Sequence, residues 1–298
     1  MRVGGNATVR VPASTANLGS GFDALGLALA LYDEVSVEVT AGGLTVEVSG
    51  EGAETVPSTE RHLVVRALRA AAEELGLELP GMALRCVNAI PHARGLGSSA
   101  AAVSAGIAAA YGLAGRDLDE TALRLAAGFE GHADNAAASL FGGLALAWAE
   151  GERFRAVRLE PHADLRPIVL VPATRSATAQ TRGLLPDRVP HVDAAHAVGR
   201  CALAVHAVTT RPDLLLVATE DRLHQNYREL AWPETMRLVR ALRENGVAAT
   251  VSGAGPTVVA FTTDGELPVG VGLDGFAARE LAVDRAGVRI VVEGTNSR

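Results

Sequence analysis

The stretch that decides the fold is Pro91-His-Ala-Arg-Gly-Leu-Gly-Ser-Ser-Ala-Ala-Ala-Val103, a glycine-containing loop that runs into an alanine-rich segment. Gly95 and Gly97 allow a tight turn and a close approach of the backbone to a ligand. Ser98 and Ser99 follow where a helix is expected to begin, with free N–H groups and the positive end of its dipole. Such a helix start binds phosphate readily. An ordinary serine-capped helix after a turn gives the same local pattern. The rest of the sequence is therefore needed to distinguish a phosphate-binding loop from such a turn.

The composition is that of a globular protein. The chain has 298 residues, 48% of them hydrophobic and 20% charged, which is enough for one large domain or two of ordinary size. A net charge of −7 without a basic cluster argues against nucleic acid or an anionic membrane as the main partner. Cys86 and Cys201 lie far apart in apolar sequence, which favours reduced thiols and a cytoplasmic location. We expect no signal peptide before Val9, and no transmembrane helix, because no uninterrupted apolar run of about 20 residues would span a bilayer.

The chain contains no lysine, because all 27 of its Lys+Arg residues are arginine. A Walker-A loop needs a lysine on the phosphates, and a protein-kinase site needs a lysine on a strand. Both kinds of site are therefore excluded. A bound nucleotide would have to be held by backbone N–H groups, a helix dipole, Mg²⁺ or arginine.

Strand and helix patterns do not alternate regularly, which favours an α+β fold. In the first half, alternating residues predict strands that include a hairpin of 32–40 with 44–49 around Gly42-Gly43. A strand over 7–11 is expected to stop at Pro12. The second half is close to a β-α-β-β-α-β split sandwich, with a helix over 273–285 and a last strand over 288–293. We place a domain boundary between residues 155 and 156.

Three loops rich in small residues also carry polar side chains: the N-terminal loop (12–23), the glycine loop (91–99) and the C-terminal loop (252–257). Each alone is compatible with a tight turn, but three of them favour convergence on a ligand. Ser98 and Glu130 are a candidate Mg²⁺ pair, because this ion takes hard oxygen ligands and few of them from protein. Neither a nucleophile elbow nor a zinc-type Cys/His spacing is present.

The glycine loop, Pro91-x-x-x-Gly95-Leu-Gly-Ser-Ser-Ala100, resembles the phosphate loop of the GHMP kinases. Three further motifs resemble the homoserine kinases of that family: Val11-Pro-Ala-Ser-Thr-Ala-Asn-Leu-Gly-Ser-Gly-Phe-Asp-Ala-Leu-Gly26, Glu130-Gly-His-Ala-Asp-Asn135 and Ser252-Gly-Ala-Gly-Pro-Thr257. The resemblance covers nearly the whole chain. It implies an N-terminal ribosomal-protein-S5-like domain over 1–155 and a C-terminal ferredoxin-like α/β sandwich over 156–298. It also implies ATP-dependent phosphorylation of the L-homoserine hydroxyl in threonine biosynthesis, by a homodimer.

The resemblance also implies roles for individual residues. ATP would be bound by Pro91, His92, Ala93, Arg94, Gly95, Leu96, Gly97, Ser98, Ser99, Ala100, Ala101, His62 and Val64. Mg²⁺ would be held by Ser98 and Glu130. Homoserine would be bound by Asn17, Asp23, His132, Arg182, Arg228, Ser252 and Gly253. The chemistry agrees, because the ammonium group of homoserine suits Asp23 and its carboxylate suits arginine forks. Arg182 and Arg228 rest on the short patterns Thr178-x-x-x-Arg182 and Gln225-x-Tyr-Arg228.

Two positions depart from the family pattern. The segment His62-Leu63-Val64 stands where Asn-Leu-Val is frequent, and Asn88 stands where a lysine is frequent. Contacts to the adenine and the phosphates are therefore expected to differ in detail.

Phosphoryl transfer depends on positioning and charge neutralisation more than on proton removal. Relatives similar to mevalonate kinase carry an aspartate base near Asp134-Asn135, so Asp134 and Asn135 are candidate catalytic residues. Asn17 is a third candidate, because its side chain can hydrogen-bond the hydroxyl or the amino group of homoserine. Which of Asp134 and Asn135 faces the hydroxyl is open. We predict that the γ-phosphate or a water accepts the proton late, without a dedicated base.

Two alternatives stay open from the sequence. One is a GHMP kinase for another small alcohol, such as mevalonate or a sugar. Asp23 with two arginines argues against mevalonate, which has no ammonium group. The other is a non-catalytic nucleotide-binding module, which would have no need of Ser98 and Glu130 as a metal pair.

Overall fold

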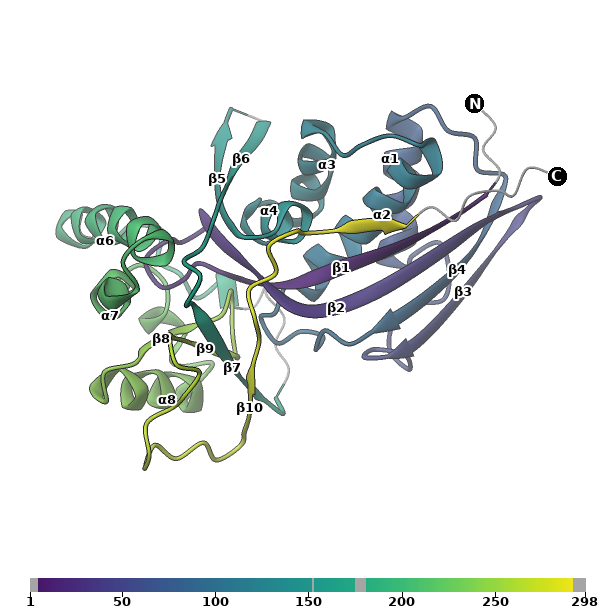
Figure 1. The fold of residues 1–298 in the computed structure, drawn as a ribbon. Coiled ribbons are helices and arrows are strands. Elements are labelled where there is room, and N and C mark those ends of the chain that lie inside the picture. Colours follow the sequence, from purple (N-terminus) through teal and green to yellow (C-terminus); the bar gives the residue numbers. More distant parts are fainter. Residues whose placement is uncertain (1–4, 152, 175–180, 292–298) are drawn as a thin grey trace.

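The computed structural model describes residues 5–151, 153–174 and 181–291, and they form two β-sheets with helices packed on both (Figure 1). The α+β fold class is confirmed. The seven-stranded first sheet has the order β11-β1-β2-β4-β3, with β5 paired to β2 and β6 to β5. Its strands are β1 (Asn6–Ala16), β2 (Leu25–Thr40), β3 (Gly43–Gly50), β4 (Gly81–Asn88), β5 (Leu144–Glu150), β6 (Arg153–Leu159) and β11 (Arg289–Val291).

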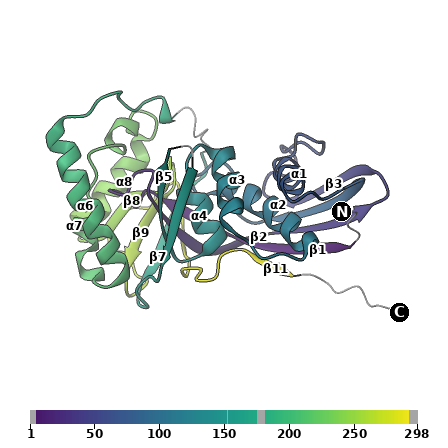
Figure 2. The ribbon, with the colours of Figure 1, turned by 90° about the horizontal axis from the view of Figure 1, so that it is seen from above.

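One face of the first sheet is covered by helices α1 (Leu63–Glu74), α2 (Ser98–Ala114), α3 (Glu120–Glu130) and α4 (Asp134–Phe141) (Figures 1 and 2). Helix α2 is the central element, because its residues are apolar on nearly every side and most of them are buried. Helix α3 is capped by Asp119, whose side chain accepts a hydrogen bond from Thr121 N–H. The glycine loop thus opens onto a helix that the core holds rigidly.

Strand β1 does not stop at Pro12, as the sequence predicts, but continues to Ala16. The register with β2 shifts between Pro12 and Ala13, so the proline lies at an irregularity where the ladder is interrupted. This extension carries the strand directly to Asn17 and the rest of the N-terminal loop.

The predicted hairpin around Gly42-Gly43 is wrong. Strand β4 lies between β2 and β3, and β3 pairs with β4 in parallel, with Val46 opposite Leu84. The reason is burial, because β4 buries Met82, Leu84 and Cys86, whereas β3 has no fully buried residue. The more apolar strand takes the inner position and leaves β3 at the edge.

The four-stranded second sheet is antiparallel and has the order β10-β7-β9-β8. Its strands are β7 (Arg166–Pro172), β8 (Ala248–Val251), β9 (Val258–Thr262) and β10 (Phe276–Glu280). Alternate residues of β9 enter two different cores, one beneath α8 (Pro233–Glu244) and one beneath α6 (His191–Thr209). A short helix, α7 (Leu215–Ala218), follows α6, and the sheet is therefore sandwiched between helices.

The helix predicted over 273–285 is also wrong. Residues Phe276–Glu280 form β10, which pairs with Ile168–Pro172 of β7, so tertiary pairing overrides local helix propensity. The last strand is β11, which joins β1 of the first sheet and not the second sheet. Residues 292 and 293 of the predicted strand lie outside the described residues, as does Thr178. The domain boundary at residue 155 stays a prediction.

Asp284 holds the returning C-terminal segment on the first sheet. Its carboxylate is 2% exposed and accepts hydrogen bonds from Tyr32 Oη at 2.8 Å and from Arg289 Nη2 at 2.8 Å. The backbone N–H groups of Ala286 and Gly287 also donate to it. Among the residues described, no helix has the length and apolar character that crossing a membrane requires.

We expect Asp284→Ala to lower the free energy of unfolding by about 3 kcal/mol, because it leaves buried donors without an acceptor. Urea unfolding measures the change. Asp274→Ala, at an exposed position, is the matched control and should cost little. Equal losses in the two variants would contradict this role of Asp284.

Candidate active site

The N-terminal, glycine and C-terminal loops meet at the junction of the two sheets. Ser252 Oγ lies 2.6 Å from the Gly95 carbonyl oxygen, and Thr257 N–H donates to the Arg94 carbonyl. Asn17 Nδ2 donates to the Gly253 carbonyl at 2.9 Å. Ser14 N–H donates to the Leu96 carbonyl at 3.1 Å, so each loop is held by the other two.

The two glycines of the glycine loop are required by both conformation and space. Their φ angles are +81° at Gly95 and +69° at Gly97, in the left-handed region. A Cβ would lie 2.3 Å from Ser252 O at Gly95 and 2.0 Å from Ser14 Oγ at Gly97. No other residue fits these positions without moving the neighbouring loops.

A cavity of about 430 Å³ lies between the three loops. Most residues that the sequence predicts for the site line it: Asn17, Asp23, His62, Val64, His92, Ala93, Gly95, Gly97, Ser98, Ser99, Ala100, Glu130, His132, Asp134, Asn135, Arg182, Arg228 and Gly253. Five predicted residues do not: Pro91, Arg94, Leu96, Ala101 and Ser252. Leu96, Ala101 and Ser252 are buried behind the loops.

Arg94 turns away from the cavity and ties the reverse side of the glycine loop to the end of β7. Its Nε and Nη2 atoms donate to the carbonyl oxygens of Pro172 and Ala173, at 2.9 and 3.0 Å. The Arg94 guanidinium is thus committed to the second sheet.

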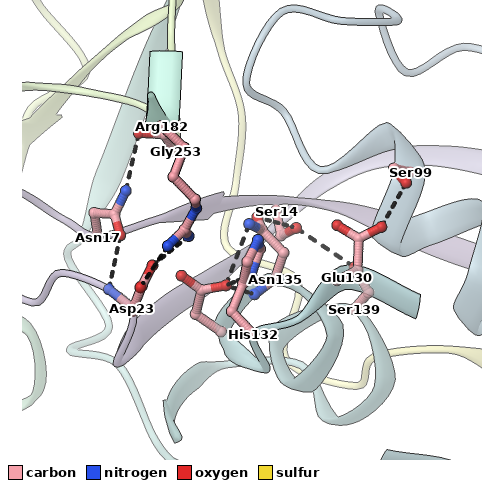
Figure 3. A network of polar contacts seen from close by, with 11 residues as sticks. Ser14, Asn17, Asp23, Ser99, Glu130, His132, Asn135, Ser139, Arg182 and Gly253 are labelled. Atoms are coloured by element: carbon pink, nitrogen blue, oxygen red, sulfur yellow. Dashed lines mark hydrogen bonds and ion pairs between the residues drawn. The ribbon is translucent and has the colours of Figure 1, made fainter. Parts of the chain in front are cut away.

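One wall of the cavity carries opposite charges. Arg182 makes a bidentate salt bridge with Asp23, from Nη1 to Oδ2 at 2.9 Å and from Nη2 to Oδ1 at 2.7 Å (Figure 3). Asp23 has a left-handed φ of +56° and is fixed further by its N–H, which donates to Asn17 Oδ1. The strained backbone points this carboxylate at the arginine.

Arg228 is 2% exposed and lies in the 3₁₀ turn Asn226–Arg228. Its Nη1 donates to His224 Nδ1 at 2.8 Å, and His224 Nε2 in turn lies 2.7 Å from Gly19 O. The histidine is therefore the neutral tautomer that donates from Nε2. Burial, together with nearby Arg182, lowers the pKa of Arg228 to about 10. A buried cation that lines a cavity and bonds a neutral imidazole is suited to an anionic ligand.

The first turn of α2 forms another wall. Gly97 caps this helix without a side chain, so the free N–H groups there are left for a ligand. Ser99 Oγ donates to Glu130 Oε1 at 2.5 Å, and Ser98 lines the same cavity. Glu130 is thus hydrogen-bonded to Ser99, whereas the sequence predicts that it pairs with Ser98.

His132, Asp134 and Asn135 form a linked polar group beside Ser14. Asp134 Oδ1 accepts from His132 Nδ1 at 2.8 Å and from the N–H of Asn135 at 2.7 Å. The hydrogen bond to Asp134 raises the pKa of His132. Asn135 Oδ1 accepts from Ser14 Oγ at 2.9 Å. Asp134 is already engaged as an acceptor, and Asn135 is held in place by two neighbours.

Asp33 lies in the cavity wall although the sequence patterns do not predict it as a site residue. Its Oδ1 accepts from the N–H groups of Ala89 and Ile90, at 2.7 and 2.9 Å. Burial raises the pKa of Asp33 to about 6. A signal for it exists, since Asp33 is the one charged residue between Leu31 and Val35 on the buried face of β2.

Comparisons with known proteins agree with this geometry. The GHMP kinases N terminal domain matches residues 62–143, and the GHMP kinases C terminal domain matches residues 205–268. A homoserine kinase from Streptomyces avermitilis is 53% identical to this chain, and the match covers 95% of each of the two chains. One from Streptomyces coelicolor is 51% identical, over 97% of this chain and 96% of that one.

Among solved structures, a homoserine kinase from Cytophaga hutchinsonii superposes with a TM-score of 0.86 at 24% identity, covering 96% of this chain and 97% of that one. This likeness shows the fold. Fold and glycine loop together define a kinase of the GHMP class. With the identity and coverage of its sequence relatives, the chain belongs to the homoserine kinase family within that class.

The raised pKa of Asp33 has a consequence for stability. The folded-state pKa of about 6 exceeds the ordinary value of 3.8, so between these pH values the native state binds more protons than the unfolded state. The contribution of Asp33 to stability is therefore highest below about pH 4 and falls as the pH rises to about 6.

We expect Asp33→Asn, which cannot ionise, to gain stability relative to the original protein as the pH rises from about 4 to about 7. Unfolding free energies of both proteins across this range measure the difference. Glu34→Gln, at the next and exposed position of β2, should show no such trend. A pH-independent difference for Asp33→Asn would contradict the raised pKa.

Proposed function

We propose that this chain transfers the γ-phosphoryl group of ATP to the side-chain hydroxyl of L-homoserine, giving O-phospho-L-homoserine. The observation that carries the proposal is the sharing of one cavity by the first turn of α2 and the charged group Asp23, Arg182 and Arg228. The names of the sequence relatives support the same substrate.

The charges fit a zwitterionic substrate. Arg228 lacks a carboxylate hydrogen-bond partner among the described residues, and Arg182 reaches into the same wall, so the two suit the homoserine carboxylate. Asp23 suits its ammonium group, and its present contact with Arg182 would then be shared with the substrate. Asn17 lies between Asp23 and Gly253, where it can orient the amino alcohol.

The phosphates of ATP would lie at the start of α2, where backbone N–H groups replace the missing lysine. The oxygen atoms of Ser98 and Glu130 fit Mg²⁺, which commonly takes one or two protein ligands and completes its shell with phosphate and water. No cluster of three His, Cys, Asp or Glu side chains that could hold another kind of metal occurs in the described residues. Bound there, Mg²⁺ would neutralise phosphate charge.

We infer that no carboxylate acts as a dedicated base. Asp134 Oδ1 accepts from His132 Nδ1 and from the Asn135 N–H, and we assign Asp134 the role of orienting these two neighbours. Asn135 is an amide and cannot take the proton. The hydroxyl proton would go late to the γ-phosphate or to water, with the residues here holding the hydroxyl in line. Threonine biosynthesis and a homodimer are part of this proposal and rest on the resemblance, and a cytoplasmic location, also part of it, rests on the two cysteines in apolar sequence.

ADP release measured with L-homoserine, L-threonine, mevalonate and galactose tests the proposal and separates it from the alternatives. We expect turnover on L-homoserine, and an increase in its KM of about 10- to 100-fold in Asp23→Asn, because a charge-assisted contact is lost. The KM for ATP should stay unchanged. Preference for mevalonate or galactose, or no turnover on any alcohol, would overturn the proposal.

Asp213→Asn is the matched control for Asp23→Asn. Asp213 also makes a bidentate salt bridge with an arginine, Arg211, at 2.8 and 2.7 Å, but Asp213 does not line the cavity. Its loss should leave the KM for homoserine unchanged.

Ser98→Ala should lower turnover by at least about 10-fold and raise the Mg²⁺ concentration needed for half-maximal rate. Ser104→Ala is its control, because Ser104 is a buried serine of the same helix that does not line the cavity. Near-normal activity and Mg²⁺ response in Ser98→Ala would show that the metal assignment is wrong.

A further inference from the structure

The cavity has an apolar part that the proposed function does not yet use. It lies between the first sheet and helices α1 and α2, and its wall consists of Val11, Val35, Val64, Ala102 and Ala105. Ala102 and Ala105 lie about one and two turns into α2, beyond Ser98. If the phosphates of ATP lie at the start of α2, the apolar wall is where its purine base fits.

Two buried polar side chains interrupt this apolar wall. His62 is 5% exposed, and its Nδ1 has no hydrogen-bond partner among the described residues. Burial, with His92 nearby, lowers the pKa of His62, so the ring is neutral. Asp33 is 4% exposed and stands opposite Val11 in the ladder of β1 and β2. Unsatisfied polar atoms in an apolar wall indicate that a ligand supplies their partners.

The two oxygens of Asp33 have different surroundings. Oδ1 accepts the N–H groups of Ala89 and Ile90, which lead directly into Pro91 and the glycine loop. No donor from the described residues bonds to Oδ2. A buried carboxylate is costly unless its lone pairs are satisfied, and an ionised carboxylate can only accept. The ligand group that meets Oδ2 must therefore be a donor.

We propose that Asp33 Oδ2 accepts a hydrogen bond from the exocyclic 6-amino group of the purine, and that Asp33 thereby selects 6-amino over 6-oxo purine nucleotides. The inference rests on the proposed function, which places a nucleoside triphosphate in this cavity. A 6-oxo group would set its oxygen against the carboxylate, acceptor against acceptor. Because Oδ1 of the same residue anchors the entry to the glycine loop, one carboxylate holds both the base and the loop that binds the phosphates.

Asp33→Asn is the test substitution. The amide is nearly isosteric, its Oδ1 can still accept from Ala89 and Ile90, and its Nδ2 presents a donor where Oδ2 was an acceptor. The expected result is a fall in kcat/KM for ATP of about 10- to 100-fold, together with a rise for ITP, which carries a 6-oxo group. The ratio of the two values should thus fall by more than about 10-fold. Purine riboside triphosphate, which has no 6-substituent, should change little.

Two controls separate base selection from a general structural role. Glu34→Gln removes a carboxylate from the next position of the same strand, on its exposed face, and should leave all nucleotide ratios unchanged. In Asp33→Asn the KM for L-homoserine should also stay the same, and the variant should unfold cooperatively. A structural defect would instead lower kcat/KM for ATP and ITP by the same factor, and that result would overturn the proposal.

Binding measurements keep this test independent of the reaction. If the original protein binds ATP but phosphorylates no alcohol, the proposed function fails, while calorimetric Kd values for ATP and ITP still decide the role of Asp33. An original protein that prefers ITP, or an ATP-to-ITP ratio that Asp33→Asn does not change, would contradict the selection of a 6-amino group.

Discussion

The structure depends on one buried hydroxyl at the meeting point of the three loops. Ser252 is fully buried, and its Oγ lies 2.6 Å from the Gly95 carbonyl oxygen and 2.9 Å from Thr15 Oγ1. One side chain at the start of the C-terminal loop, directly after β8, thus holds the glycine loop and the strand that enters the N-terminal loop. Since the first sheet and the C-terminal loop after β8 both contribute residues to the cavity, this contact sets the distance between the two sides of the site. It also explains why Ser252 matters without lining the cavity.

Because the chain contains no lysine, the positive potential of the site has to come from other groups. Positive potential comes from the start of α2 and from two arginines, one of them buried against a neutral histidine. An arginine keeps its charge when buried more readily than lysine does, because its ordinary pKa is higher. Arg228 illustrates this, since its pKa of about 10 still leaves it protonated at neutral pH.

Local chemistry explains which features could be predicted from the sequence. Gly95, Gly97 and the serines after them predict a loop and a helix start, and the motifs include most of the predicted residues that line the cavity. The strand order could not be read locally, because the insertion of β4 between β2 and β3 depends on which strand buries more apolar surface. Arg94 shows the same limit, since its direction is set by carbonyls of β7 that lie far away in the chain. Asp33 was visible only as a charge on an apolar strand face.

The most direct test of the account is a crystal structure of the protein with L-homoserine and a non-hydrolysable ATP analogue. The account predicts the phosphates on the first turn of α2, the homoserine carboxylate against Arg182 and Arg228, its ammonium group against Asp23, and its hydroxyl directed at the γ-phosphate. Homoserine bound outside this cavity, or phosphates bound away from the glycine loop, would contradict it.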